Sequence, residues 1–520
     1  MDRPVNRPPH LNLVVCKQVR DLSPERGFGL KQKRFYLELL LTLLFTVLGF
    51  AVMGYHPGLE DDGVYLTAVK ARVNPALFSH NAEFFQLQMQ ATVFDGLISH
   101  FVRLTGIPVA WAALLWQFAA LFVILWACNR IAALIFQEVH ARWAAVAMVA
   151  AMFTLPAAGS ALTLADQHLH PRNLATALIL LAVWRVLDGK RGQAALFLLA
   201  AFLLHPIMSV LGMSFCGFLV LALLEPVPFR IRALQDSMAS AVPLGWVFAQ
   251  PTSNWREAVM TRTYYFLYRW TWYEWLGALA PLILFGLLWQ IALRRGENRL
   301  ARFALAVFAY GVFQQVVAMV VLAPGTLERL IPLQPMRYLQ LVYISMALIA
   351  GGLLGKFVLQ NRAWRWAVCL LLLNGGMFLA QLRLMDDSAH FEFPWTRSSN
   401  PWLQAFDWVR RETPEDAYFA LDPRYLAAPG EDFHSFRALA ERSQLADAVK
   451  DAAVVTQVPT IAETWHDQVA AAAGWAHFKT DDFERLKAQF GVDWVIVPYP
   501  QTAALACRWH NDSLAVCQIP

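Results

Sequence analysis

The sequence FYLELLLTLLFTVLGFAVM at residues 35–53 is followed directly by GYHPGLEDDGVY at residues 54–65. The first stretch carries one charged side chain, and an apolar helix of this length can cross about 30 Å of hydrocarbon. The second stretch places three adjacent carboxylates at the end of that helix. An apolar span that leads into an acidic loop predicts a membrane protein with a polar site at one membrane face.

The composition extends this prediction to most of the chain. Of its 520 residues, 58% are hydrophobic and 16% are charged, whereas soluble domains carry about 25% charged residues. Residues 386–520 differ, because they hold 11 Lys and Arg against 20 Asp and Glu. We therefore expect a polytopic α-helical membrane domain followed by a soluble C-terminal α/β domain. Disordered, fibrous, disulfide-framework and small cytosolic proteins are excluded.

Apolar runs of membrane-spanning length predict about eleven transmembrane helices. A weak run at 236–250 is interrupted by Pro243 and Gly245. Residues 84–105 are amphipathic, which fits either a further span or a helix lying along the interface. The ten clearer spans lie near residues 35–53, 109–129, 142–158, 172–188, 192–205, 207–224, 274–293, 301–322, 335–355 and 364–381.

The distribution of Lys and Arg predicts the orientation, because cytoplasmic loops are enriched in these residues. With eleven spans and the N-terminus inside, 22 of the 32 cations in residues 1–385 face the cytoplasm. The expected parts are then a cytoplasmic leader (1–33), a membrane domain (34–385) whose first outer loop is 54–108, and an extracytoplasmic domain (386–520).

Within this last domain, the patterns predict helices at 400–412, 433–450 and 481–490, with Gly491 ending the third. Strands are expected at 417–421 and 494–497, and a hairpin around Asn511-Asp512. Cys507 and Cys517 lie five residues on either side of Asp512, so they either pair across the hairpin or serve as separate core residues.

The acidic loop is the first candidate site. Glu60, Asp61 and Asp62 repel one another, and each ionised carboxylate raises the pKa of its neighbours. A cation, a metal ion or a transferred proton would stabilise such a group, and a general base needs this kind of tuning. The alternative is a solvated acidic turn after a helix end.

A second polar cluster lies between the third and fourth expected spans, on the same predicted face. His168 and His170 could bind a metal ion together with Asp166, or make interfacial hydrogen bonds. Arg172 lies at the start of a span, where a helix N-terminus already favours anions. It is therefore a candidate anion anchor.

Further polar residues fall on this face. His205 is either a helix-end residue or part of the site. Arg256, Arg329 and Arg337 lie where cations are disfavoured, and a guanidinium there can clamp a phosphate or extend its charge towards the interface. Acids and cations together suit an anionic lipid donor and a hydroxyl acceptor.

With these features the chain resembles the GT-C superfamily of integral-membrane glycosyltransferases, in particular its poorly characterised bacterial members. These enzymes take sugars from polyprenyl-phosphate or polyprenyl-diphosphate carriers. The resemblance rests on the acids Glu60-Asp61-Asp62 after the first span, a second polar loop with Asp166, many further spans and a C-terminal domain. It implies that Asp61 or Asp62, beside Glu60, is the first-loop acid. Asp166 is then the second-loop acid, and Arg337, together with Arg329, binds phosphate.

The resemblance further implies a location in the bacterial inner membrane, with a periplasmic C-terminal domain and a sugar transferred with inversion to a hydroxyl acceptor. Asp61 or Asp62 would be the general base, with Mg or Mn as the cofactor if one is needed. Asp61, Asp166 and His168 are the metal-ligand candidates. The partners are a polyprenyl-phosphate-linked sugar, an unassigned glycan, lipid or protein acceptor, and the bilayer, but no nucleic acid. The alternatives are a secondary transporter and a lipid-linked polysaccharide polymerase or ligase.

Overall fold

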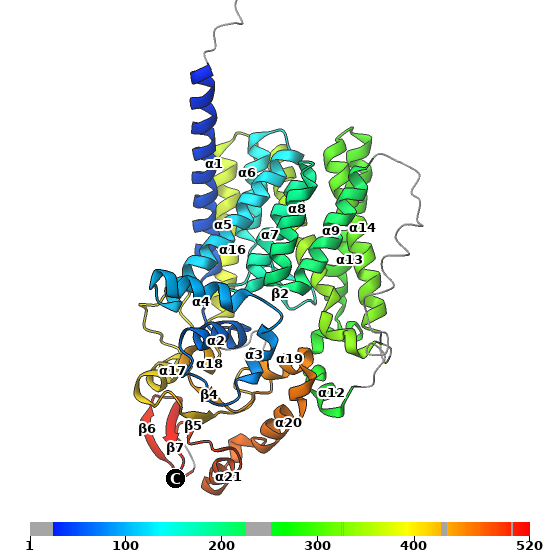
Figure 1. Cartoon of the computed structure of the whole chain (residues 1–520). Coiled ribbons are helices and arrows are strands. Elements are labelled where there is room, and N and C mark those ends of the chain that lie inside the picture. Colours follow the sequence, from blue (N-terminus) through cyan, green and yellow to red (C-terminus); the bar gives the residue numbers. More distant parts are fainter. Residues whose placement is uncertain (1–23, 225–250, 324, 326, 428–433, 501–502) are drawn as a thin grey trace, which may run out of the picture.

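A computed structural model describes residues 24–224, 251–323, 325, 327–427, 434–500 and 503–520. Its upper part in Figure 1 is a bundle of apolar helices, and beneath the bundle lie the first loop and the C-terminal region. Within the described residues, seven helices are long and apolar enough to cross a membrane. Together with the sheet-containing C-terminal region, they define a polytopic helical membrane protein.

Helices occupy ten of the eleven positions at which spans are expected, and the weak span at 236–250 lies outside the described residues. The long helices are α1 (Pro24–Met53), α5 (Val109–Ile135), α9 (Pro206–Leu223), α13 (Trp272–Arg294), α14 (Asn298–Val321), α16 (Ala363–Leu384) and α15 (Tyr338–Leu354), the last of which reaches spanning length with the helical turns on either side of it, Glu328–Leu359. Three shorter helices complete the bundle: α6 (Val139–Ala151), α7 (Pro171–Leu187) and α8 (Arg191–Leu204). The number of crossings therefore remains a prediction.

One expected boundary is wrong, because α6 ends at Ala151 rather than near residue 158. Helix α1 begins at Pro24, within the expected leader 1–33, but its apolar, span-length part begins at Gln32 and agrees with the expected span. The chain beyond α6 forms a short hairpin of β1 (Pro156–Ala157) and β2 (Leu162–Thr163). Pro156 disfavours helical backbone at the residue before it, which is consistent with the early end of α6.

The first loop folds into three helices, α2 (Asp62–Val73), α3 (Glu83–Met89) and α4 (Phe94–Thr105). The amphipathic stretch 84–105 is thus divided between two short helices, neither of which has spanning length. Figure 1 shows α4 lying across the end of the bundle rather than along it. This orientation agrees with an interfacial helix and not with a further span.

The C-terminal region is built on a five-stranded mixed sheet with the order β4-β3-β5-β7-β6. Strand β3 is parallel to β4 and β5, and β7 is antiparallel to β5 and β6. The strands are β3 (Tyr418–Ala420), β4 (Ser443–Gln444), β5 (Trp494–Pro498), β6 (Ala506–His510) and β7 (Leu514–Gln518). The helices are α17 (Pro401–Glu412), α18 (Phe436–Ala440), α19 (Lys450–Gln457), α20 (Ala462–Ala471) and α21 (Thr480–Phe490).

Most of the elements expected here are present, and Gly491 ends α21 with a positive φ of 79°. Cys507 and Cys517 form a disulfide across the hairpin, which confirms that alternative. The single helix expected at 433–450 is wrong. Glu441 adopts a φ of 55° after α18, and the carboxylate of Asp447 accepts hydrogen bonds from the first turn of α19. A turn and a capping residue therefore divide the stretch.

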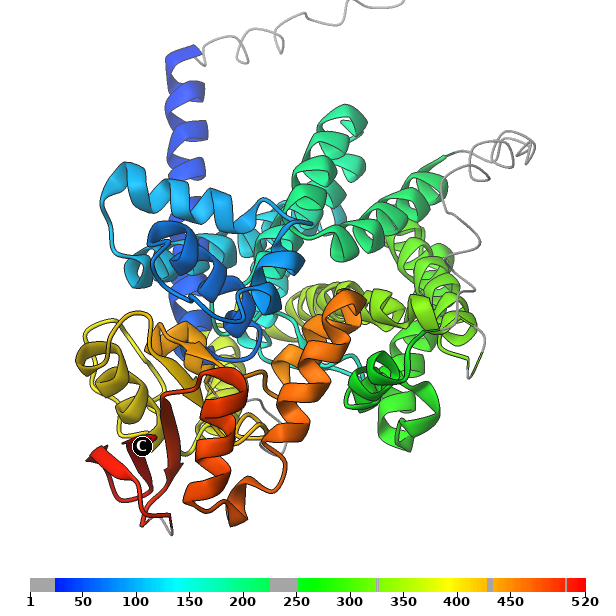
Figure 2. The same cartoon turned by 60° about the horizontal axis from the view of Figure 1, so that its bottom comes forward.

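The first loop is attached to the C-terminal region by its backbone. The amide of Tyr55 donates to the carbonyl of His390, and the amide of Ser435 donates to the carbonyl of Gly58 at 2.7 Å. A Cβ atom on Gly54 would lie 2.6 Å from the same His390 carbonyl oxygen, so a larger residue does not fit there. Figure 2 shows the first loop, in blue, beside the yellow and orange parts of the C-terminal region.

Candidate functional site

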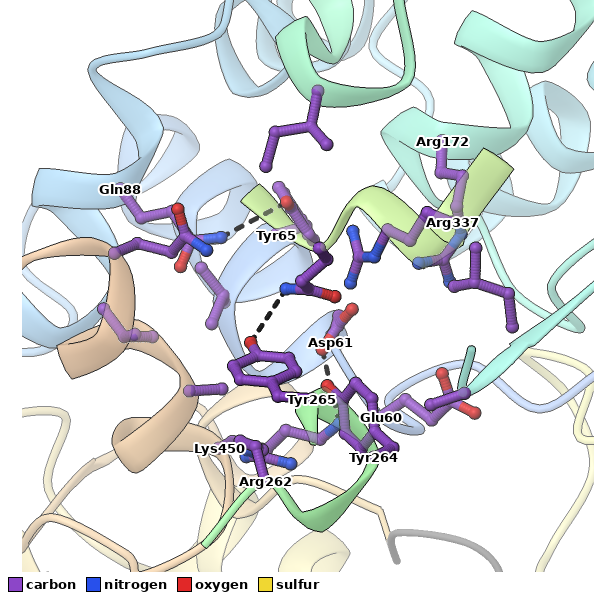
Figure 3. Close-up of a pocket in the computed structure, with 18 of the residues that line it drawn as sticks. Glu60, Asp61, Tyr65, Gln88, Arg172, Arg262, Tyr264, Tyr265, Arg337 and Lys450 are labelled. Carbon is purple, nitrogen blue, oxygen red and sulfur yellow. Dashed lines mark hydrogen bonds and ion pairs between the residues drawn. The ribbon is translucent and has the colours of Figure 1, made fainter. Parts of the chain in front are cut away.

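A cavity of about 940 Å³ lies between the helical bundle, the first loop and the C-terminal region. Its walls come from parts of the chain that are far apart in sequence, including α2, the β1–β2 hairpin and α19. Six of the expected site residues line it: Glu60, Asp61, Asp166, Arg172, His205 and Arg337. Figure 3 shows Arg172 and Arg337 beside Asp61 in this cavity.

Asp61 is held as an anion. Its carboxylate lies 3.3 Å from Nζ of Lys450 and 3.3 Å from Nε2 of His170. Burial acts to raise the pKa of Asp61, but Lys450 and His170 outweigh it and hold that pKa well below its usual range. Asp61 is therefore ionised at neutral pH.

Glu60 and Asp62, the two acidic neighbours of Asp61, differ from it in pKa and in position. Burial raises the pKa of Glu60 to about 7, against the opposing effect of Lys450. Glu60 also has a positive φ of 48°, a backbone conformation that costs non-glycine residues about 1–3 kcal/mol and that is concentrated at functional sites. Asp62 does not line the cavity. Its carboxylate instead accepts a hydrogen bond of 2.8 Å from the amide of Gly58 and so stabilises the loop.

Arg172 and Asp166 form a buried ion pair. The guanidinium donates to both carboxylate oxygens, with an Nε–Oδ2 distance of 3.0 Å. Burial acts to raise the pKa of Asp166, but Arg172 and His170 lower it to about 2. Since each side chain largely neutralises the other, Arg172 keeps little net charge for a further anion.

Arg337, unlike Arg172, forms no ion pair with a carboxylate of the described residues. Within the part of the chain that the structure describes, no carboxylate lies within ion-pair distance of its guanidinium, and its buried Nε has no hydrogen-bond partner. In Figure 3 the guanidinium extends into the cavity towards Asp61 and Tyr65. An unpaired guanidinium at a cavity wall is suited to bind an anion bidentately.

Three helix N-termini reinforce this preference for an anion. Arg172 lies in the first turn of α7, His205 caps α9, and Arg337 immediately precedes α15. All three residues line the cavity. Because the N-terminus of a helix carries a partial positive charge, their convergence favours an anionic ligand at this end of the bundle.

Four expected site residues lie outside the cavity wall, in addition to Asp62. His170 contacts Asp61 and accepts a hydrogen bond from the amide of Arg172, so it orients the site. His168 is buried, and its ring lies against His170. Arg256 forms an ion pair with Glu328 at 2.8 Å, and Arg329 lies over the ring of Trp255.

Several cavity residues were not among the predicted site residues, although Arg262 is a cation on the face where cations are disfavoured. Lys450 comes from α19 and reaches Asp61 across 389 positions of sequence, a separation at which no local pattern could have shown the contact. The segment that precedes α13 contributes Arg262, Tyr264 and Tyr265, and its density of aromatic and basic residues was a usable signal. The hydroxyl of Tyr265 accepts a hydrogen bond from Gln334 at 2.8 Å.

The pKa of Glu60 predicts a pH-dependent stability. Because its folded pKa of about 7 lies above the unfolded value of about 4.3, the folded state binds the extra proton between these values, and stability falls as pH rises through that range. Glu60→Gln removes this loss. We expect the variant to gain about 1–3 kcal/mol over wild type above pH 7 and little near pH 4.5, measured by thermal unfolding. A pH-independent difference would contradict the assignment.

No family model and no curated protein matches the chain. Among solved structures, it is similar to the archaeal oligosaccharyltransferase AglB from Archaeoglobus fulgidus, determined in complex with an inhibitory peptide and a dolichol-phosphate. The identity is 12%, over 89% of this chain and 70% of that one, with a TM-score of 0.37. A likeness at this level does not establish a shared activity.

Proposed function

We propose that this protein is a membrane glycosyltransferase of the GT-C type, which moves a sugar from a polyprenyl-phosphate or polyprenyl-diphosphate carrier to a hydroxyl acceptor. The observation that carries the proposal is the cavity itself, where an unpaired guanidinium, Arg337, and an ionised carboxylate, Asp61, line the same space. A group-transfer site for an anionic donor needs both a cation for the leaving phosphate and a base for the acceptor.

Arg337 binds the phosphate of the carrier in this proposal, assisted by the N-termini of α7 and α9. Lys450 lies beside Asp61 and is near enough to share its charge with the incoming phosphate. A phosphate that draws Lys450 away would raise the pKa of Asp61 and make it a stronger base. Protonated Glu60 donates a hydrogen bond and adds no negative charge, which its pKa of about 7 permits.

In the chemical step, Asp61 takes the proton of the acceptor hydroxyl, and the acceptor oxygen forms a bond to the anomeric carbon. The bond between that carbon and the phosphate oxygen breaks, and the phosphate leaves with the electron pair. Attack from the side opposite the leaving group inverts the anomeric centre. The positive charge of Arg337 stabilises the charge that develops on the phosphate.

The site faces the extracytoplasmic side of a bacterial inner membrane in this proposal. The distribution of Lys and Arg supports this orientation, since it places the N-terminus in the cytoplasm and the C-terminal domain outside. Glu60, Asp61 and Asp166 lie in one cavity, as a single working site requires.

Lipid binding tests the proposal without knowledge of the sugar. We expect the purified protein in detergent to bind undecaprenyl phosphate about 10–150 times more tightly than undecaprenol, measured by native mass spectrometry, because a charge-assisted hydrogen bond contributes about 1.5–3 kcal/mol. Equal binding of the phosphate and the neutral alcohol would reject a phosphate-carrier site.

A further inference from the structure

A second group of polar side chains, outside the cavity wall, is buried where three parts of the chain meet. His56 belongs to the first loop, Glu392 to the segment after α16, and His434 to the segment before α18. Their exposed fractions are 0%, 8% and 2%. One potential ligand atom from each residue lies within 4.8 Å of the others.

Hydrogen bonds among these three side chains leave several of their nitrogen and oxygen atoms without a partner. Nε2 of His434 lies 2.6 Å from Oε2 of Glu392, which accounts for one contact. Nδ1 of His56 lies 3.5 Å from the same oxygen, too far for a good hydrogen bond. Both ring nitrogens of His56 and Oε1 of Glu392 are buried, and none of the residues that the structure describes, which exclude 428–433, offers them a hydrogen-bond partner. A buried polar atom without a partner costs about 1–3 kcal/mol, so a missing ligand is indicated.

We propose that His56, Glu392 and His434 bind one zinc ion. Two imidazoles and a carboxylate are ligands that zinc prefers, at about 2.0–2.2 Å, and donors around a tetrahedral ion lie about 3.3 Å apart. Two of the observed separations, 2.6 Å and 3.5 Å, lie within about 0.7 Å of this value, and the third, which is within 4.8 Å, must shorten as the side chains turn towards the ion. The two oxygens of one carboxylate are too close together to occupy two corners of a tetrahedron, so Glu392 supplies one donor, the imidazoles of His56 and His434 supply two, and a water molecule fills the fourth position. This site contains none of the metal-ligand candidates Asp61, Asp166 and His168.

The role of the ion is structural. His56 lies four residues before Glu60, and the backbone on either side is already paired, through Tyr55 with His390 and through Gly58 with Ser435. Zinc would join the same three segments through their side chains. It would hold the first loop against the C-terminal region and so fix the position of the loop acids. The inference does not depend on the proposed transferase activity.

Metal content tests the site directly. The full-length protein is purified with a tag free of histidine, equilibrated with zinc, separated from unbound metal by gel filtration and analysed by mass spectrometry for metals. We expect about one zinc ion per chain, and at least a tenfold lower content in Glu392→Gln and His434→Ala. The amide introduced by Glu392→Gln can still hydrogen bond to His434 but is a poor zinc ligand, so this variant separates ligation from hydrogen bonding. His466→Ala, which replaces a partly exposed histidine outside the group, should keep its zinc.

A second measurement uses unmodified protein, because the variants could fail to fold. Removal of zinc with a chelator should lower the unfolding temperature of the wild type, and added zinc should restore it. A wild type that holds no zinc after equilibration and is unaffected by the chelator would overturn the proposal. Full zinc content in both Glu392→Gln and His434→Ala would place the ion elsewhere and would equally overturn it.

Discussion

Asp61→Asn is expected to lower the rate of sugar transfer by about 10²–10⁴, the contribution that a positioned general base makes. The asparagine side chain has nearly the same shape but cannot accept the proton of the acceptor hydroxyl. It also no longer attracts Lys450, which lies 3.3 Å from the carboxylate. The measurement is the turnover of a polyprenyl-phosphate sugar by purified protein at matched concentration, with folding checked by gel filtration and thermal unfolding.

Two variants control for this result. Asp188→Asn changes a carboxylate at the other end of α7, where it pairs with Lys190, and should leave the rate unchanged. Asp62→Asn should mainly destabilise the protein, because the carboxylate of Asp62 accepts the hydrogen bond from Gly58. If Asp62→Asn abolished transfer in a stable protein while Asp61→Asn remained active, the assignment of the base to Asp61 would be wrong.

Arg337→Gln should have the next largest effect, on donor affinity. Loss of a charge-assisted contact to phosphate costs about 1.5–3 kcal/mol, which corresponds to a 10- to 150-fold increase in the KM for the lipid donor. Substitution of this residue should not expose a buried partner charge, because no carboxylate of the described chain pairs with it. Steady-state kinetics with varied donor concentration would measure the change.

Arg191→Gln is a matched control, because Arg191 is exposed at the start of α8, away from the cavity. It should retain the wild-type KM. Arg329→Gln separates the two arginines that the resemblance suggests for phosphate binding. A large increase in KM for Arg329→Gln with none for Arg337→Gln would transfer the phosphate-binding role to Arg329.

Local patterns were sufficient to predict much of the fold. Hydrophobic runs located ten helices, because a span must be apolar along its whole length, and turn residues located Gly491 and the Asn511-Asp512 hairpin. The stretch 433–450 was predicted less well. Its composition suits a single helix. The structure instead ends α18 before β4, which pairs with β3, and starts α19 after Asp447, whose carboxylate caps that helix.

The residue types in the sequence indicated which residues belong to the site, but they did not show which of these residues contact one another. The charges of Asp166 and Arg172 indicated polar function, yet the structure shows that they largely neutralise each other. That pairing depends on the turn of the chain into α7. The contact of Lys450 with Asp61 and the grouping of His56 with Glu392 and His434 depend on the docking of the C-terminal region, which no short stretch of sequence determines.

The most direct test of the transferase proposal is turnover in reconstituted vesicles. Wild-type protein and Asp61→Asn are given polyprenyl phosphates that carry radiolabelled mannose, glucose or galactose, together with envelope material from cells that lack this protein as the source of acceptor. We expect the label to leave the lipid fraction and to enter an acceptor with at least one donor, in the wild type only. Label that stays lipid-linked with every donor, or equal transfer by the wild type and Asp61→Asn, would contradict the proposed site.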